Sequence, residues 1–315
     1  MGYLKTSLPV FLIYTTLYSY FYQKNLDDFF RTYLDVGLAI ASFGLLQVFI
    51  KFTTGIGLLS PYSSLDLHSI VTEPSHYVVV ILPALVYSFF YYKKYKFHFW
   101  LFLATLMLTF KLTAFVSLLI IFVLARFKLI YILFSVPFVY VGYHYLMSIP
   151  EYVLRITPIA NILGADLEKV VVLHGTPLSF LSNLEVAFDS ATRNLFFGGG
   201  LGSHPYSYDR YFTSNPWIGV ESQFGLNQNS GHSILIRLLS EVGYTGLCLI
   251  LGMMIKIFRE VRSSHVNKVI FFAALSHFVA KSIKLGGYID FGTPVFFCIL
   301  LVLLGKKQKK LIKLS

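Results

Sequence analysis

The chain has 315 residues, of which 56% are hydrophobic and 17% aromatic, and its mean hydropathy is +0.68. A soluble fold cannot bury that much apolar surface, and several apolar runs approach the roughly 20 residues that a transmembrane helix needs. The net charge of +11 resides mainly in short basic segments between these runs, which is typical of cytoplasmic loops and argues against nucleic acid as a partner. The composition therefore predicts an all-α polytopic membrane protein.

The sequence indicates neither a disulfide framework nor a metal site. Its two cysteines, Cys248 and Cys298, both lie in apolar runs. No cluster of His, Cys or Asp residues has the spacing of metal ligands, and no Asp-x-Asp pair is present. We therefore expect no metal and no cofactor.

Three spans are predicted in the first part of the chain. Residues 8–22 form an apolar run with no small-residue cleavage site after it, which indicates an uncleaved anchor. Residues 32–52 and 76–92 form the second and third runs, and basic residues follow the third at 93–96. The connection before the third run is rich in Gly and Ser and ends with Glu-Pro-Ser at 73–75.

The next apolar stretch, residues 97–124, has basic residues on both sides, so both of its ends are predicted to be cytoplasmic. It is too short for two spans of roughly 20 residues each. Two half-crossings with a turn at 109–113 satisfy both constraints. A broken backbone at membrane depth must be buried in protein or line a wet cavity, so Lys111 would lie at a functional cavity. The alternative is one long tilted helix from which Lys111 reaches the interface.

Residues 129–147 are predicted to cross outward, and residues 148–231 contain no spanning run. This long segment carries four basic and seven acidic residues, a net charge of −3, in a chain whose total is +11. Negative charge is consistent with the outer face of the membrane. We therefore predict one large outer loop at 148–231 within a single integral membrane domain, residues 1–315.

One helix is predicted inside the outer loop, at residues 177–197. Asp189 and Arg193 lie one helical turn apart and can pair on its surface. The glycine-rich run at 198–202 lacks the Lys-Ser/Thr of a P-loop, so a flexible turn is the better interpretation than a nucleotide site. The apolar stripe of the helix consists of Leu181, Leu184, Phe188, Ala191 and Leu195.

His232 marks the border between the outer loop and the next apolar run, residues 233–257. Arg237 and Glu241 follow it at a spacing of i, i+4, which puts both on one helix face. Ionisable groups inside an apolar run need a partner or a wet cavity. Gly243 would let a neighbouring helix approach closely, and so would Gly246. From the residues alone, a structural ion pair and a catalytic site are equally open.

The last two spans are predicted at 269–285 and 295–304, with a turn between them and a basic tail at 306–310 inside. The whole chain then has about 8–9 transmembrane segments, including the broken hairpin.

The order of these features resembles the O-antigen ligase and O-antigen polymerase family of bacterial envelope proteins. The strongest likeness is His232-Ser233, nine residues and Gly243, which is similar to the family's signature at the return from its large periplasmic loop. The apolar-then-glycine run at 194–202, preceded by Arg193, also resembles the family pattern. At the broken hairpin the family usually has Arg, where this chain has Lys111. Lysine keeps the positive charge but lacks the planar guanidinium that binds a phosphate through two hydrogen bonds.

The resemblance covers roughly residues 53–304 and implies a metal-independent glycosyltransferase of the bacterial inner membrane, with its large loop in the periplasm. An acceptor hydroxyl would attack a saccharide on undecaprenyl pyrophosphate, and lipid pyrophosphate would leave. A histidine suits the general base, which would be His232. Cations must hold the pyrophosphate, a role implied for Arg193 and Lys111. Weaker candidates for substrate contact are Arg155, Arg210, Tyr211 and Glu73.

Several functions remain open at this point. Glu-Pro-Ser at 73–75 resembles many polysaccharide polymerases, which favours polymerisation of repeat units into O-antigen, capsule or exopolysaccharide. The first alternative is an O-antigen ligase of lipopolysaccharide biosynthesis, which transfers polymer to the lipid A core. The second is a transporter of lipid-linked sugar or a small anion, although the two halves of the sequence show no paired symmetry. It also stays open whether the chain binds a chain-length regulator. A further alternative is an envelope protein without catalytic activity.

Overall fold

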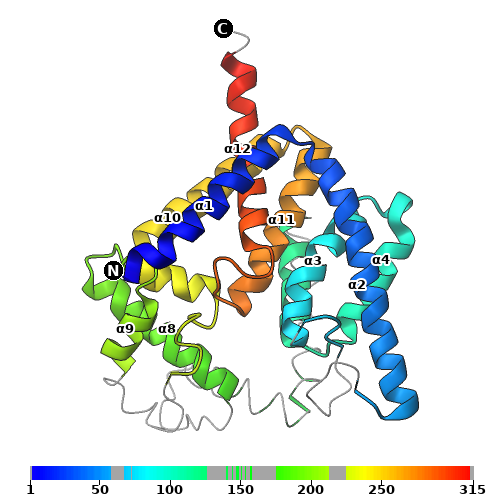
Figure 1. The fold of residues 1–315 in the computed structure, drawn as a ribbon, viewed down its shortest axis with the longest axis horizontal. Coiled ribbons are helices and arrows are strands. Elements are labelled where there is room, and N and C mark those ends of the chain that lie inside the picture. The colour runs from blue at the N-terminus through cyan, green and yellow to red at the C-terminus, as the bar shows by residue number, and fades with distance from the viewer. Residues whose placement is uncertain are drawn as a thin grey trace. The chain divides into compact units, whose positions relative to one another are not determined.

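Figure 1 shows the computed structural model of the chain, which describes residues 2–57, 67–71, 73–125, 175–212 and 225–312, with isolated positions between 140 and 157. Every regular element in these ranges is a helix, which confirms the predicted all-α class. The chain divides into two compact units. The first comprises Met1–Phe122 and Ile250–Ser315, and the second comprises Val123–Leu249.

The first unit is built around a buried helix, α3 (Pro74–Phe90), whose side chains are almost all inaccessible. It packs against α11 (His265–Ile283), α4 (Tyr92–Met107) and α2 (Leu26–Thr54). A second pair consists of α1 (Gly2–Gln23) and α12 (Thr293–Ile312). Aromatic rings fill the centre, where Phe30 of α2 stacks on Tyr87 of α3 with 5.2 Å between ring centroids.

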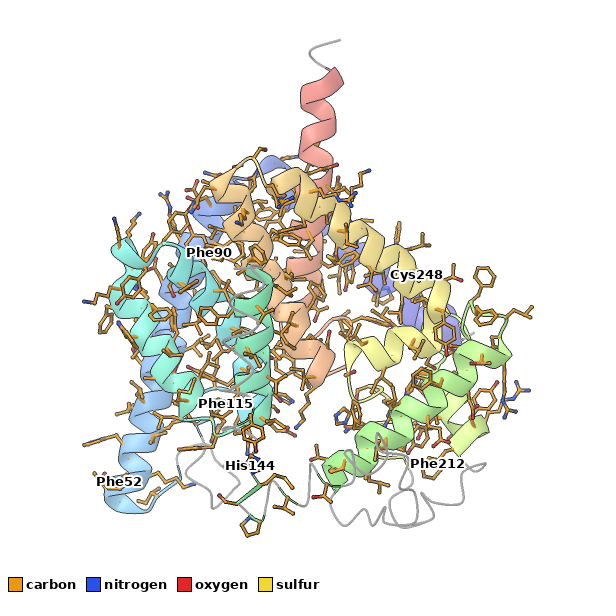
Figure 2. All side chains as sticks on the ribbon, turned by 180° about the vertical axis from the view of Figure 1, so that it is seen from behind. Phe52, Phe90, Phe115, His144, Phe212 and Cys248 are labelled. Atoms are coloured by element: carbon orange, nitrogen blue, oxygen red, sulfur yellow. The ribbon has the colours of Figure 1, made fainter. Side chains whose placement is uncertain are left out.

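Three helices, α2, α11 and α10 (Ile234–Val261), are long and apolar enough to cross a membrane. Shorter apolar helices are α3, α5 (Leu112–Ala125) and the first part of α12. The end of α2 exposes large apolar side chains, such as Phe52, which is labelled in Figure 2 and is 79% accessible. Apolar side chains on the outside of apolar helices indicate a membrane protein. The count of 8–9 spans stays a prediction, and the span predicted at 129–147 lies outside the described residues.

The predicted break in the stretch 97–124 is confirmed. Helix α4 ends at Met107 and α5 begins at Leu112, so one continuous helix is excluded. Phe110 between them has a positive φ of 49°, which an α-helix does not allow. The backbone around the break is hydrogen-bonded, because Leu108 O accepts from Leu67 N–H at 3.1 Å. Lys111 is half-buried at this break.

The second unit contains α8 (Gly175–Arg193), α9 (His204–Tyr211) and the first half of α10. Helix α8 confirms the helix predicted at 177–197, but it ends at Arg193 because Leu195 and Phe196 adopt positive φ angles of 53° and 68°. The predicted apolar stripe is only partly correct. Leu181 and Ala191 are buried, whereas Phe188 is 46% accessible and Leu195 is 79% accessible. The buried face of α8 mixes apolar residues with four polar ones, Ser179, Ser182, Asn183 and Ser190.

Helix α10 is broken at Gly243, although the sequence predicted one continuous span. Gly243 has φ 65° and ψ −169°, a conformation that is essentially restricted to glycine. In an unbroken helix, Thr245 N–H would bond Glu241 O. Here Thr245 N–H donates to Phe196 O at 3.2 Å, and Glu241 O accepts from Gly200 N–H at 2.8 Å.

The glycine run therefore completes the broken helix. Gly199 N–H also donates to Ser240 O, at 2.9 Å. A Cβ atom on Gly243 would lie 2.1 Å from Phe196 O, and one on Gly198 would lie 2.6 Å from Gly243 N. Gly243 thus permits close approach, as predicted from the sequence, but the neighbour is the backbone of a turn rather than a helix. The run predicted as a flexible turn has a defined structural role.

We expect Gly243→Ala to destabilise the second unit, because the new methyl group meets a backbone oxygen and the ψ and φ angles suit only glycine. Strain of this kind costs roughly 1–3 kcal/mol before the steric overlap is added. Thermal unfolding in detergent, followed by circular dichroism, measures the effect. The matched control is Gly252→Ala in the same helix, where an added Cβ meets no atom within 4 Å. An equal response of the two variants would contradict the account.

Candidate functional site

His232 lies in a strained turn that leads into α10. Ser233 N–H donates to Gly231 O at 2.6 Å, so His232 is the central residue of a γ-turn, and its φ is 61°. The positive-φ form of this turn is rare and strained. Histidine tolerates a left-handed conformation better than most residues, but the cost is still on the order of 1 kcal/mol. Strain of this kind often accompanies a functional role.

His232 is 5% accessible, and residues of α8 orient its imidazole. Its Nδ1 lies 3.0 Å from Ser179 Oγ, and the edge of Phe180 packs on the ring with centroids 5.6 Å apart. Ser179 Oγ also accepts from Asn227 Nδ2 at 2.7 Å and lies 3.4 Å from Leu226 O. The Ser179 hydroxyl has a single proton to donate. When this proton points to Leu226 O, Ser179 Oγ is the acceptor for His232 Nδ1–H. The other ring nitrogen of His232, Nε2, then carries the lone pair that a base needs.

A second histidine, His204 at the start of α9, is fully buried beside this turn. Asn183 Nδ2 donates to the carbonyl oxygens of Ser179 and Leu226 at 2.6 and 2.9 Å, so its Oδ1 is the acceptor for His204 Nε2–H at 2.8 Å. Nδ1 of His204 therefore has the lone pair, and it has no hydrogen-bond partner within the described residues. Burial, together with the charge of Arg237, lowers the pKa of His204 to about 4.

These contacts join the two histidines through one face of α8. Asn183 and Ser179 are spaced i, i+4, so they lie one above the other and meet His204 and His232 respectively. The sequence reasoning missed His204, Asn183 and Ser179 as site residues. The available signal was the i, i+4 row of Ser179 and Asn183, on a helix of which only the apolar stripe and the Asp189–Arg193 pair were considered.

A cationic cluster forms where α8 and α9 end. Arg193 and Arg210 both lie against the ring of Tyr211, with guanidinium carbons 5.3 and 5.5 Å from its centroid. Arg193 Nε is also 3.7 Å from Asp189 Oδ1, which confirms the predicted pair. The Arg193 side chain is 59% accessible, so this ion pair adds little stability. Three residues predicted separately as substrate contacts are thus brought together.

The cationic cluster is not adjacent to His232. Ser179, which contacts His232, and Arg193 are fourteen residues apart on α8, or about 21 Å along the helix axis. A different cation lies beside the histidine turn. Arg237 packs against Gly231, whose added Cβ would be 3.0 Å from the Arg237 Cβ. Arg237 Nε donates to Glu241 Oε1 at 2.8 Å, and the Glu241 side chain is fully buried, which confirms the pair predicted from spacing.

The remaining predicted residues lie elsewhere. Glu73, in the first unit, accepts from Lys284 Nζ at 2.8 Å. Partial burial alone would raise the pKa of Glu73, but the hydrogen bond from Lys284 holds it below the ordinary value. Lys111 is also in the first unit, and Arg155 lies outside the described residues.

Within the described ranges, no three His, Cys, Asp or Glu side chains are grouped so that they could hold a metal ion. No model of a known protein family matches the chain, and no curated protein is similar to it. The resemblance to the O-antigen ligase and polymerase family therefore stays a prediction that rests on the motif residues themselves. The two segments that carry it most strongly, 194–202 and 232–243, are the ones that dock against each other in the second unit.

We expect the stability of the second unit to fall as the pH falls from about 6.5 towards 4. His204 in the unfolded chain takes up a proton near its ordinary pKa of 6.5, whereas the folded state resists protonation down to about 4. The unfolded state therefore binds more protons in this window, and the loss reaches roughly 3 kcal/mol at its acid end.

The matched variant is His204→Gln, whose amide nitrogen can keep the bond to Asn183 but does not titrate in this range. Melting temperatures of both proteins between pH 7 and 4 give the comparison. A wild-type pH dependence no steeper than that of the variant would contradict the assignment to His204.

Proposed function

We propose that the protein is a metal-independent glycosyltransferase of the bacterial inner membrane that polymerises undecaprenyl pyrophosphate-linked repeat units at the periplasmic face. The observation that carries the proposal is the environment of His232. Its imidazole is held in a strained turn, packed by Phe180 and bonded at Nδ1 to Ser179. A histidine that serves only as a packing residue does not require this conformation, whereas a positioned base benefits from it.

In the proposed reaction, His232 Nε2 takes the proton of an acceptor hydroxyl while that oxygen bonds to the anomeric carbon of the donor. The bond from the anomeric carbon to the pyrophosphate oxygen breaks, and its electron pair leaves with the lipid pyrophosphate. Ser179 Oγ accepts from Nδ1–H of His232 and stabilises the imidazolium that forms, because its distance of 3.0 Å suits a hydrogen bond.

Geometry separates the cations into two roles. The distance from the base nitrogen to the leaving phosphate is only about 8 Å when the acceptor oxygen and the anomeric carbon lie in line between them. Arg193 is too far along α8 for that distance, so we assign it, with Arg210 and Tyr211, to a more distant part of the substrate. Arg237, beside the histidine turn, is the better cation for the departing pyrophosphate, and the buried Glu241 holds it in place. Lys111 and Glu73 remain proposed substrate contacts.

A transporter of lipid-linked sugar or a small anion is a second candidate, and one observation in the first unit favours it. Lys281 of α11 is completely buried and donates to Gly287 O, Asp290 Oδ1 and Thr293 Oγ1. Ionisable groups buried in a membrane protein commonly mark an ion or substrate pathway. The genetic test below separates this candidate from the enzyme.

We expect His232→Asn to abolish surface polymer without lowering the amount of protein in the membrane. Asparagine also tolerates a positive φ, so the variant removes the base while sparing the turn. Loss of a general base lowers the rate by about 10²- to 10⁴-fold. Ser179→Ala, which removes only the partner of Nδ1, should give an intermediate loss.

Gel electrophoresis of cell-surface polysaccharide gives the readout. A lost polymerase leaves lipid A core with a single repeat unit, a lost ligase leaves bare core with polymer stranded on the lipid carrier, and a lost transporter leaves bare core without polymer. Polymer of normal length and amount in the His232→Asn strain would rule out the base.

We expect Arg193→Ala to raise the KM for the lipid-linked donor by about 10- to 100-fold, since a charged hydrogen bond contributes about 1.5–3 kcal/mol. Arg193→Lys should retain part of the affinity for the donor, because the positive charge remains. Arg31→Ala is the matched control, as Arg31 is similarly exposed, at 53%, and paired with an Asp at i−4. An unchanged KM in Arg193→Ala would remove this residue from the substrate site.

A further inference from the structure

The turn between α8 and α9 presents an unusual group of exposed apolar side chains. Leu195 is 79% accessible, Phe196 57%, Phe197 68% and Leu201 61%. All four lie within seven consecutive residues, and we call them the apolar tip. Exposed apolar side chains grouped in this way mark an interaction surface, whereas single exposed ones need no explanation.

The backbone holds the apolar tip in a fixed position. Leu195 and Phe196 have positive φ angles, which bulky residues avoid unless the surrounding structure imposes them. Phe196 N–H donates to Ala191 O at 3.0 Å, and Phe196 O accepts from Thr245 N–H at 3.2 Å. The outward direction of these side chains is therefore built into the docking of the turn on α10, and it is not the result of a loose loop.

The apolar tip docks at the start of the part of α10 that follows the break at Gly243. From Tyr244 to Val261 the helix extends about 27 Å, close to the roughly 30 Å of a bilayer core. Its outer surface is apolar, since Leu249 is 70% and Leu251 58% accessible. Cys248, labelled in Figure 2, belongs to the same exposed part of α10. The tip therefore docks beside Tyr244 in a helix that is itself a candidate span.

The chemistry around the apolar tip matches a membrane interface. Arg193 precedes the tip and Arg210 lies in α9 after it, and both side chains meet at the ring of Tyr211. Tyr206 of α9 is 65% accessible. Apolar groups that enter the acyl region, aromatic residues at the boundary and cations that meet anionic headgroups are the components of an interfacial anchor.

We propose that the apolar tip inserts into the bilayer leaflet at the Tyr244 end of the α10 span, which places Arg193 and Arg210 at headgroup level, where they contact anionic lipid when the lipid-linked donor proposed above is not bound. The second unit is then attached to the membrane by two elements, the span and the tip, which share the break at Gly243. This anchor does not depend on glycosyl transfer.

Site-directed spin labelling of the full chain in vesicles tests the proposal. The background carries Cys248→Ser and Cys298→Ser, and single labels are attached through Phe197→Cys and Leu201→Cys; Leu201 lies outside the two strained positions. Leu249→Cys serves as the control within the span, and Asn229→Cys, on the exposed turn before His232, serves as the aqueous control. The vesicles contain phosphatidylcholine and phosphatidylglycerol at about three to one.

We expect labels at 197 and 201 to be relaxed more strongly by oxygen than by a water-soluble nickel complex, as at 249, whereas the label at 229 shows the opposite order. Omission of phosphatidylglycerol should move both tip labels towards the values at 229, because the attraction between arginine and anionic lipid is lost. Two results would overturn the proposal. Tip labels that behave like the label at 229 lie in water, and tip labels protected from both reagents are covered by protein.

Discussion

The second unit depends on the break of α10 at Gly243. A broken helix exposes backbone N–H and C=O groups, and these must find partners because the break at Gly243 is buried away from water. The glycine run supplies the partners through hydrogen bonds between Gly199 and Ser240, Gly200 and Glu241, and Phe196 and Thr245. The two backbones touch directly, which Gly198 and Gly243 allow because they lack Cβ atoms. One contact therefore fixes both the start of α10, with His232 before it, and the direction of the apolar tip.

A buried polar network adds a second constraint. His204, Asn183, Ser179 and His232 form a continuous chain of hydrogen bonds between α9, α8 and the turn before α10. Each such bond contributes only about 1 kcal/mol net, but an unmade one costs roughly 1–3 kcal/mol. The network therefore favours a single arrangement of these elements more than it adds stability. The hydrogen bonds of that arrangement offset the free-energy cost of the strained turn at His232 and hold its ring in one orientation.

The proposed base and the proposed anchor lie at different ends of α8. The end near Ser179 holds His232, with Arg237 beside it, whereas the end at Arg193 leads into the apolar tip. A lipid-linked substrate has the same division, since its reacting sugar is polar and its carrier belongs in the bilayer. In the proposed arrangement, α8 meets the membrane surface at one end and positions the proposed base at the other, about 21 Å away.

The sequence alone determined the features that depend on composition and local spacing. Hydropathy predicted the helical membrane class, and the basic residues on both sides of 97–124 predicted the break before Lys111. The i, i+4 spacing predicted the ion pairs Asp189–Arg193 and Arg237–Glu241. Tertiary structure decided the rest. The bend at Gly243 and the burial of His204 arise from contacts between segments that are distant in the chain, and such contacts leave no periodic signal. Phe188 fits the helical period but is exposed, because α8 buries a neighbouring face on which polar residues such as Ser179 and Asn183 found partners. Leu195 is exposed because the helix ends before it.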